Sequence, residues 1–223
     1  MAFGGQPAKL PRGEWRILLG HALTLVDEIA RRGTPDPFWT LGGGTVLMLR
    51  YRHRRSKDID IFVPDPQYLG FVSPRLNKVA EGISADYVEG AGFVKLIRPE
   101  GEIDFVAAPN LTGRPFDTWK LLRRSIRVET AVEIIAKKLW HRGEMVTARD
   151  LFDLSLVIER HPGSLAKASR FLRRHRRAFA AQLHDRAEVL HAQFEAIDRL
   201  QYRPTFEAAV ARAEGFLRGL SAR

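Results

Sequence analysis

The chain has 223 residues, 45% of them hydrophobic, and a net charge of +10. This is enough for one large or two small globular domains. The absence of cysteine excludes disulfides and thiolate metal sites. The N-terminus lacks the apolar core of a signal peptide, and no apolar stretch reaches the roughly 18 residues of a membrane span. We therefore expect a cytoplasmic protein with no membrane partner.

The first half of the chain mixes expected helices with expected strands. Apolar spacing and turn residues predict helices over 14–32, 45–51 and 74–82, and strands over 38–41, 58–63, 93–98 and 102–107. The last two strands should form a hairpin across residues 99–101. This order predicts an α/β domain with a mixed sheet over residues 1–115.

The second half is expected to be helical throughout. Helical spacing of apolar residues predicts helices over 129–142, 147–160, 165–179, 186–200 and 205–217. The overall fold class is therefore α+β, with a C-terminal α-helical domain over residues 116–223.

Two carboxylates alternate with apolar residues in the strand predicted over 58–63. Asp58 and Asp60 would share one face, while Ile59 and Ile61 bury the other. Two like charges held this close are costly without a cation, and Mg²⁺ prefers such oxygen ligands and shares them with phosphates. The alternative is an exposed strand edge whose carboxylates pair with the nearby arginines.

The glycine triplet Gly42–Gly44 precedes a predicted helix. Glycine permits close backbone approach, and a helix N-terminus offers unpaired N–H groups to a phosphate. Most such triplets are simply turns. Followed by the two aspartates, however, this triplet indicates nucleotidyl transfer.

A third carboxylate is expected where two metal ions bind. Glu102 and Asp104 would lie on one face of their strand, and Asp104 is the better candidate because apolar residues flank it. The alternative is an ordinary hairpin strand with an outward-facing aspartate.

The helix predicted over 129–142 carries a lysine on its apolar arc. A helical wheel places Lys138 on this arc, whereas Lys137 lies on the other side and should form a surface pair with Glu133. In the next helix, Asp150 lies within the apolar arc and Asp153 at its margin. Lys138 could bind a triphosphate while Asp153 orients it or assists catalysis. Equally, these residues could form buried ion pairs between helices.

Together these motifs resemble the AbiEii-type nucleotidyltransferase toxins, including the MenT-type toxins, of the polymerase-β-like superfamily. The resemblance covers roughly residues 38–155 and rests on four motifs. They are Gly43-Gly44-Thr45, Arg54-Arg55-Ser56-Lys57-Asp58-Ile59-Asp60, Lys138-Leu139 and Arg149-Asp150-Leu151-Phe152-Asp153-Leu154. The spacing from glycine to aspartate is longer than in the minimal polymerase-β pattern but fits the AbiEii-like one.

The resemblance implies a role for each matched residue. Nucleotide phosphates would lie against Gly43, Gly44, Thr45 and Ser56. Asp58 and Asp60 would hold magnesium, Lys138 would contact the triphosphate, and Asp153 would be catalytic or nucleotide-binding. Ser56 would also be a phosphorylation site through which a cognate antitoxin inhibits the toxin. The third carboxylate, Asp104, is not fixed by the resemblance.

Clustered cations indicate a polyanionic partner. One run spans residues 50–57 and another 170–177, and such clusters attract nucleic acid. The residues that we expect to contact RNA are Arg52, Arg54, Arg55, Arg173, Arg174 and Arg177. Family analogy favours a tRNA 3′ end as the acceptor. The alternatives are a solvated basic surface and an acidic partner protein.

The favoured function is therefore a magnesium-dependent nucleotidyltransferase, the toxin of a toxin–antitoxin pair, that joins a nucleotide from an NTP to RNA. A nucleotidyltransferase that modifies a protein or a small molecule is one alternative. A non-catalytic module that binds RNA or a partner protein is another, although such a module has no need of both aspartates and Lys138.

Overall fold

The computed structural model describes residues 5–220 and divides into two compact units. The first unit comprises the described residues up to Arg50 together with 56–110 and 116–129. The second comprises 51–55, 111–115 and the described residues from Thr130 onward. Neither unit is therefore one continuous stretch of the chain. Across residues 5–220, no helix has the length and apolar character that crossing a membrane requires.

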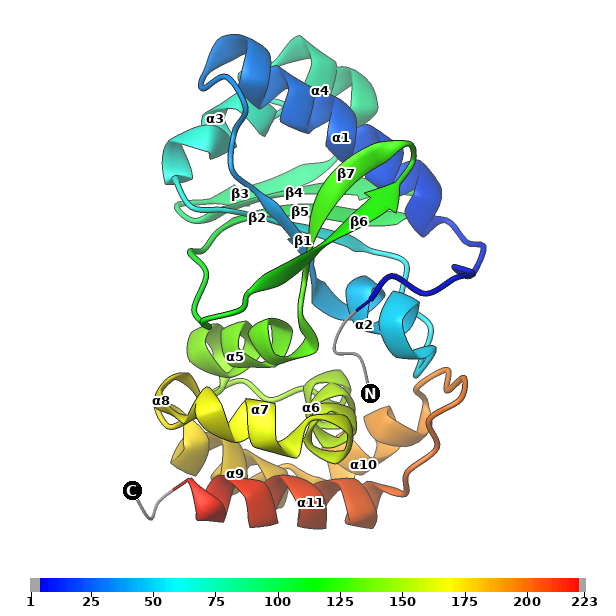
Figure 1. Cartoon of the computed structure of the whole chain (residues 1–223), viewed down its shortest axis with the longest axis vertical. Helices are drawn as coiled ribbons and strands as arrows, with labels where there is room; N and C mark the ends of the chain where they lie inside the picture. The colour runs from blue at the N-terminus through cyan, green and yellow to red at the C-terminus, as the bar shows by residue number, and fades with distance from the viewer. Residues whose placement is uncertain (1–4, 221–223) are drawn as a thin grey trace. The chain divides into compact units, whose positions relative to one another are not determined.

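A mixed sheet forms the centre of the first unit (Figure 1). Its strands are β1 (Thr40–Gly42), β2 (Ile59–Val63), β3 (Tyr87–Gly90), β4 (Phe93–Arg98), β5 (Gly101–Ala107), β6 (Phe116–Leu121) and β7 (Arg124–Glu129). They lie in the order β3-β4-β5-β2-β1-β7-β6. The β2–β5 and β1–β7 pairs are parallel, and the other neighbouring strands are antiparallel. The predicted hairpin of β4 and β5 is confirmed.

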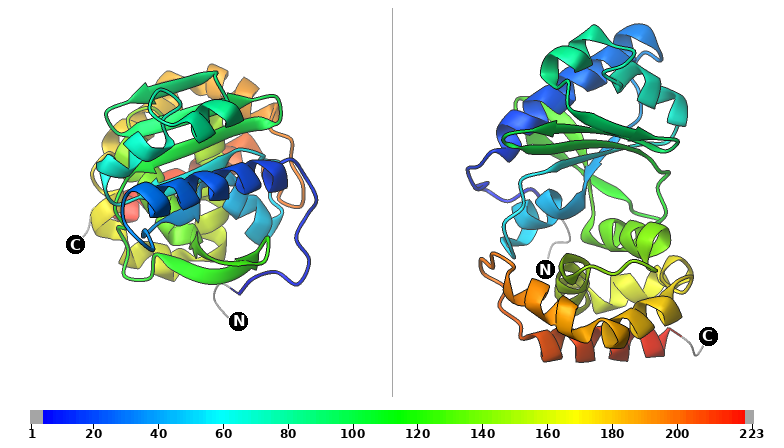
Figure 2. Two further views of the ribbon diagram at one scale, coloured as in Figure 1. Left: turned by 90° about the horizontal axis from the view of Figure 1, so that it is seen from above. Right: turned by 180° about the vertical axis from the view of Figure 1, so that it is seen from behind.

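Three helices cover one face of this sheet (Figures 1 and 2). They are α1 (Trp15–Arg32), α3 (Leu69–Val72) and α4 (Lys78–Ile83). Because side chains alternate along a strand, β2 and β5 bury Ile59, Ile61, Ile103 and Phe105. Their intervening residues, which include two aspartates, lie on the opposite face.

The arginine at the end of α2 (Gly43–Tyr51) fixes this helix to the sheet. The Arg50 guanidinium donates to the carbonyl oxygens of Glu129 at 2.7 Å and Val128 at 3.1 Å. It also pairs with Asp117 at 3.0 Å and lies over the Trp119 ring. These contacts hold the C-terminal end of α2 against the end of β7.

The sheet continues beyond the predicted domain boundary at residues 115/116. Strands β6 and β7 pair with each other, and β7 pairs with β1, so residues 116–129 belong to the first unit. The predicted boundary is therefore wrong, because it assigns this hairpin to the helical domain. β3, the edge strand beside β4, was also not predicted.

Helices alone build the second unit from Thr130 onward. They are α5 (Ala131–Arg142), α6 (Ala148–Arg160), α7 (Pro162–Lys167), α8 (Ser169–Leu172), α9 (Arg176–Asp185), α10 (Ala187–Glu195) and α11 (Phe206–Gly219). α6 contacts α5, α7, α10 and α11 and forms the centre of the unit. The predicted helix over 165–179 is interrupted, because the backbone leaves helical geometry at Ala168 and His175.

The Glu133–Lys137 pair exists but is buried, so its predicted surface position is wrong. The Lys137 Nζ lies 3.8 Å from the Glu133 Oε1, and Lys137 is only 3% exposed. The Glu133 carboxylate also accepts hydrogen bonds from the backbone N–H groups of Leu111 and Thr112, each at 2.8 Å. The carboxylate thus binds the 111–115 segment, which covers it.

Candidate active site

Four residues form a row across strands β4, β5, β2 and β1. Lys95 is the register partner of Asp104, Asp104 of Asp60, and Asp60 of Gly42. Register partners on neighbouring strands direct their side chains to the same face. The row therefore brings one ammonium and two carboxylates together on the face opposite α1.

The two carboxylates of this row resist simultaneous ionisation. Burial, followed by the negative charge of Asp60, raises the pKa of Asp104 to about 7, although Lys95 acts in the opposite direction. Like charges at close range always disfavour the second ionisation. A divalent cation between Asp60 and Asp104 would relieve this repulsion, so these two residues fit a metal ion.

Lys95 and Glu102 complete the polar side of β4 and β5. The Lys95 ammonium pairs with the Glu102 carboxylate and lies 3.4 Å from the Asp104 Oδ2. The sequence pattern indicates Glu102 but not Lys95, because only the antiparallel register of the hairpin brings Lys95 to Asp104. Strand alternation combined with the predicted hairpin could have identified it.

Neighbouring carboxylates leave no room for a side chain at two positions of the glycine turn. A Cβ on Gly43 would overlap the Asp60 carboxylate, and the positive φ of 73° is itself unfavourable for other residues. A Cβ on Gly42 would overlap the carboxylate of Glu129 and the ring of Phe62. Glycine is thus required here because acidic side chains occupy the space above the turn.

Glu129 is a second residue at this turn that the sequence does not predict. It ends β7, is fully buried, and its Oε1 accepts a hydrogen bond from the Thr40 hydroxyl at 2.8 Å. The sequence predicts that residue 129 starts a helix, and no sequence signal indicates that its side chain reaches Gly42.

Asp58 is oriented differently from Asp60. Its Oδ1 accepts a hydrogen bond from the backbone N–H of Glu102 at 3.0 Å, just ahead of β2. Within the described part of the chain, no group of three or more histidine, aspartate or glutamate side chains is arranged to hold a metal ion. The structure thus brings Asp60 and Asp104 together but does not gather all three predicted ligands.

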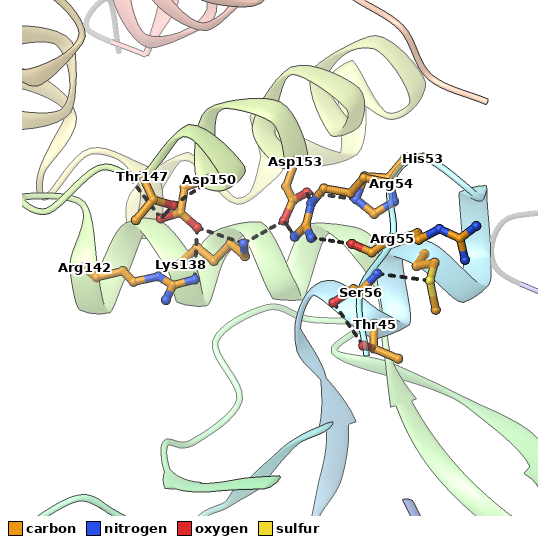
Figure 3. A network of polar contacts seen from close by, with 11 residues as sticks. Thr45, His53, Arg54, Arg55, Ser56, Lys138, Arg142, Thr147, Asp150 and Asp153 are labelled. Carbon is orange, nitrogen blue, oxygen red and sulfur yellow. Dashed lines mark hydrogen bonds and ion pairs between the residues drawn. The ribbon is translucent and has the colours of Figure 1, made fainter. Parts of the chain in front are cut away.

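Two of the predicted nucleotide-binding residues contact each other. The Thr45 hydroxyl, in the first turn of α2, donates to the Ser56 Oγ at 3.1 Å (Figure 3). Thr45 is buried and Ser56 is partly exposed. The hydroxyl of Ser56 therefore lies at the glycine-turn end of α2.

The helical unit contains a separate network of charges centred on Asp153 (Figure 3). The Arg54 Nε and the Lys138 Nζ each lie 2.7 Å from this carboxylate, and the His53 Nε2 lies 2.8 Å from it. Lys138 also donates to Asp150 at 2.8 Å. The predicted alternative of buried ion pairs between helices α5 and α6 is the arrangement found.

The network keeps both of its carboxylates ionised. Burial alone would raise the pKa of Asp153, but the charges of Arg54 and Lys138 hold that pKa well below its usual range. The pKa of Asp150 is also lowered despite its burial, by Lys138 and Arg142. Burial lowers the pKa of His53, so this ring is neutral and donates its Nε2 proton to Asp153.

The cations predicted to contact RNA differ in exposure. Arg52, Arg55, Arg174 and Arg177 are exposed, and Arg173 is partly so. Arg54 is only 4% exposed and binds Asp153, so it is not a surface cation, contrary to our prediction. The exposed arginines come from two separate segments of the second unit.

Comparisons with solved structures establish the class of fold. A crystal structure of a candidate nucleotidyltransferase from Helicobacter pylori aligns with a TM-score of 0.52 and 16% identity, over 94% of this chain and 96% of that one. JHP933 from Helicobacter pylori aligns with a TM-score of 0.51 and 17% identity, over 95% of this chain and 93% of that one. The fold is that of a nucleotidyltransferase.

A family comparison then identifies the protein more closely. Residues 25–214 match the model described as nucleotidyl transferase AbiEii toxin, type IV toxin–antitoxin system. The chain therefore belongs to the AbiEii nucleotidyltransferase toxin family, and it is an enzyme of that class. A comparison with curated proteins found no match.

Proposed function

We propose that this enzyme transfers a nucleotide from a nucleoside triphosphate to a hydroxyl group of RNA, in a magnesium-dependent reaction. The observation that carries the proposal is the Asp60–Asp104 pair beside the glycine turn, with Asp60 packed directly over Gly43. Two carboxylates that resist joint ionisation need a cation, and a triphosphate brings one with it.

In the first unit, different residues would bind the metal ion and the phosphates. Asp60 and Asp104 would hold Mg²⁺, and Asp58 stays a predicted third ligand. Gly43, Gly44, Thr45 and Ser56 would bind the phosphates. Bound there, Mg²⁺ would offset the charge that develops on the triphosphate and on the leaving pyrophosphate. The acceptor oxygen bonds to the α-phosphorus, the bond to pyrophosphate breaks, and the hydroxyl proton passes to water.

An RNA acceptor is supported by charge. The net charge of +10 includes the exposed Arg52, Arg55, Arg174 and Arg177, which would attract a phosphate backbone. A tRNA 3′ end is the acceptor that we favour. The strong positive charge disfavours a small cationic acceptor.

Family membership supports an antitoxin as the protein partner. Phosphorylation of Ser56 is the means of inhibition that we propose, because a phosphate on this hydroxyl would lie beside Thr45 and compete with the nucleotide for the same turn. The roles predicted for Lys138 and Asp153 toward the triphosphate stay predictions. The Lys138 ammonium already donates a hydrogen bond to the Asp153 carboxylate within the helical unit.

Label transfer tests the proposed acceptor. The chain would be incubated with Mg²⁺, each α-labelled nucleoside triphosphate in turn, and total cellular RNA and protein. Label in tRNA-sized RNA, with one preferred base, is the expected result. Label confined to a protein band or to a small molecule would overturn the RNA acceptor while keeping the nucleotidyl transfer.

A further inference from the structure

The outermost member of the row across the sheet is a cation rather than a carboxylate. Lys95 lies on β4, immediately beyond Asp104 and on the side away from Asp60. A site for two divalent cations would need its second ion to share a carboxylate with the first. In this sheet, the outer side of Asp104 already faces an ammonium.

Two contacts hold this ammonium in place. Lys95 lies 3.4 Å from the Asp104 Oδ2 and pairs more closely with Glu102, and its side chain is 30% exposed. Glu102 lies two residues before Asp104 on β5, so its side chain is on the same face of the strand. A lysine anchored by two carboxylates is not a freely moving surface cation, so it stays beside Asp104.

A divalent ion on the outer side of Asp104 would meet two obstacles. It would have to share Asp104 with the ammonium, and it would be repelled by that positive charge at short range. It would also lose Glu102 as a ligand, because Lys95 occupies that carboxylate. On the inner side, Asp104 and Asp60 present two carboxylates from neighbouring strands to one ion.

We infer that Lys95 takes the place of a divalent cation on the outer side of Asp104, so that metal binding is confined to the side of Asp104 that faces Asp60. This inference rests on the proposed metal-dependent function. It assigns to Lys95 a role in setting metal stoichiometry. Removing the ammonium should free Glu102 and the outer side of Asp104 for a second ion.

Counting bound Mn²⁺ tests the inference without any activity measurement. The whole chain would be titrated with Mn²⁺ alone, and the free ion followed by electron paramagnetic resonance. The wild-type chain gives the reference number of bound ions. Lys95→Met should bind one further ion or bind Mn²⁺ at least about tenfold more tightly, whereas Lys95→Arg, which keeps the cation, should match the wild type.

Lys78→Met is the matched control. Lys78 also pairs with a glutamate, Glu81, but its side chain is 92% exposed, and the substitution removes one positive charge from the same unit. It should leave the stoichiometry unchanged. Lys95→Gln provides a second neutral variant in case the methionine variant fails to fold.

The outcomes separate this inference from the proposed function. Neutral Lys95 variants that bind the same number of ions as the wild type, with the same affinity, would overturn the role of Lys95 alone. No Mn²⁺ on any variant, or undiminished binding by Asp60→Asn, would overturn the metal site of the proposed function as well.

Discussion

Asp60 and Asp104 occupy equivalent positions on two adjacent parallel strands, and the charge of the first raises the pKa of the second. This pair links the fold to its chemistry, because the parallel pairing of β2 and β5 is what brings the two carboxylates together. Neither aspartate alone would indicate a metal site. Their shared register makes them a candidate metal site.

The raised pKa of Asp104 predicts how stability depends on pH. An unfolded aspartate loses its proton near pH 4, whereas folded Asp104 keeps it up to about pH 7. Between these values the folded chain binds more protons, so the free energy of unfolding should fall as pH rises. Asp104→Asn should flatten this slope in urea denaturation between pH 5 and 7.

Asp27→Asn is the control for that slope. The pKa of Asp27 is lowered by Arg124, so this residue is ionised throughout the same window in both states. Its removal should leave the slope unchanged. An unaltered slope in Asp104→Asn would show that Asp104 titrates normally.

The same titration predicts proton release when a divalent cation binds. At pH 6 Asp104 holds a proton that Mg²⁺ must displace, so the affinity for Mg²⁺ should rise as pH increases toward 7. Calorimetry in buffers of different ionisation enthalpy measures the number of protons released. About one proton at pH 6 is expected, and none from Asp104→Asn.

Gly43→Ala should damage the site and the fold together. Its φ of 73° is unfavourable for alanine, and the new Cβ would push against the Asp60 carboxylate. We expect a loss of about 1–3 kcal/mol in the free energy of unfolding and weaker Mn²⁺ binding. Gly82→Ala, where a Cβ meets nothing within 4 Å, should not destabilise the chain.

The two consecutive arginines at residues 54 and 55 offer a matched test of the buried charge network. Arg54 pairs with Asp153, which is fully buried, and Arg55 pairs with Asp198, which is 61% exposed. Asp153→Asn should destabilise the chain by about 3–5 kcal/mol, because it leaves buried cations uncompensated. Asp198→Asn should have little effect, and equal effects in chemical denaturation would contradict the structural role of the network.

The sequence predicted those parts of the fold that depend on local pattern. Asp58-Ile59-Asp60-Ile61 alternates as a half-buried strand should, and the Pro99–Gly101 turn marked the β4–β5 hairpin. The β6–β7 hairpin escaped prediction because its two-residue turn is Leu122-Arg123. Both residues have positive φ, a conformation for which glycine or asparagine is the usual signal.

The parts of the site that were missed depend on contacts between distant segments. Lys95 reaches Asp104, and Glu129 reaches Gly42, only once the sheet has formed. Glu133 binds backbone N–H groups more than 20 positions earlier in the chain, and its partner Lys137 is buried beside it. Helical periodicity contains no information about such a partner.

The proposed nucleotidyl transfer depends on the Asp60–Asp104 pair. This dependence is tested by the rate of label transfer from an α-labelled nucleoside triphosphate to RNA, measured for the wild type, Asp60→Asn and the exposed-carboxylate control Glu81→Gln. Asp60→Asn should lose activity by about 100-fold or more while remaining folded, and Glu81→Gln should match the wild type. Full transfer by a folded Asp60→Asn variant would show that nucleotidyl transfer does not depend on this pair.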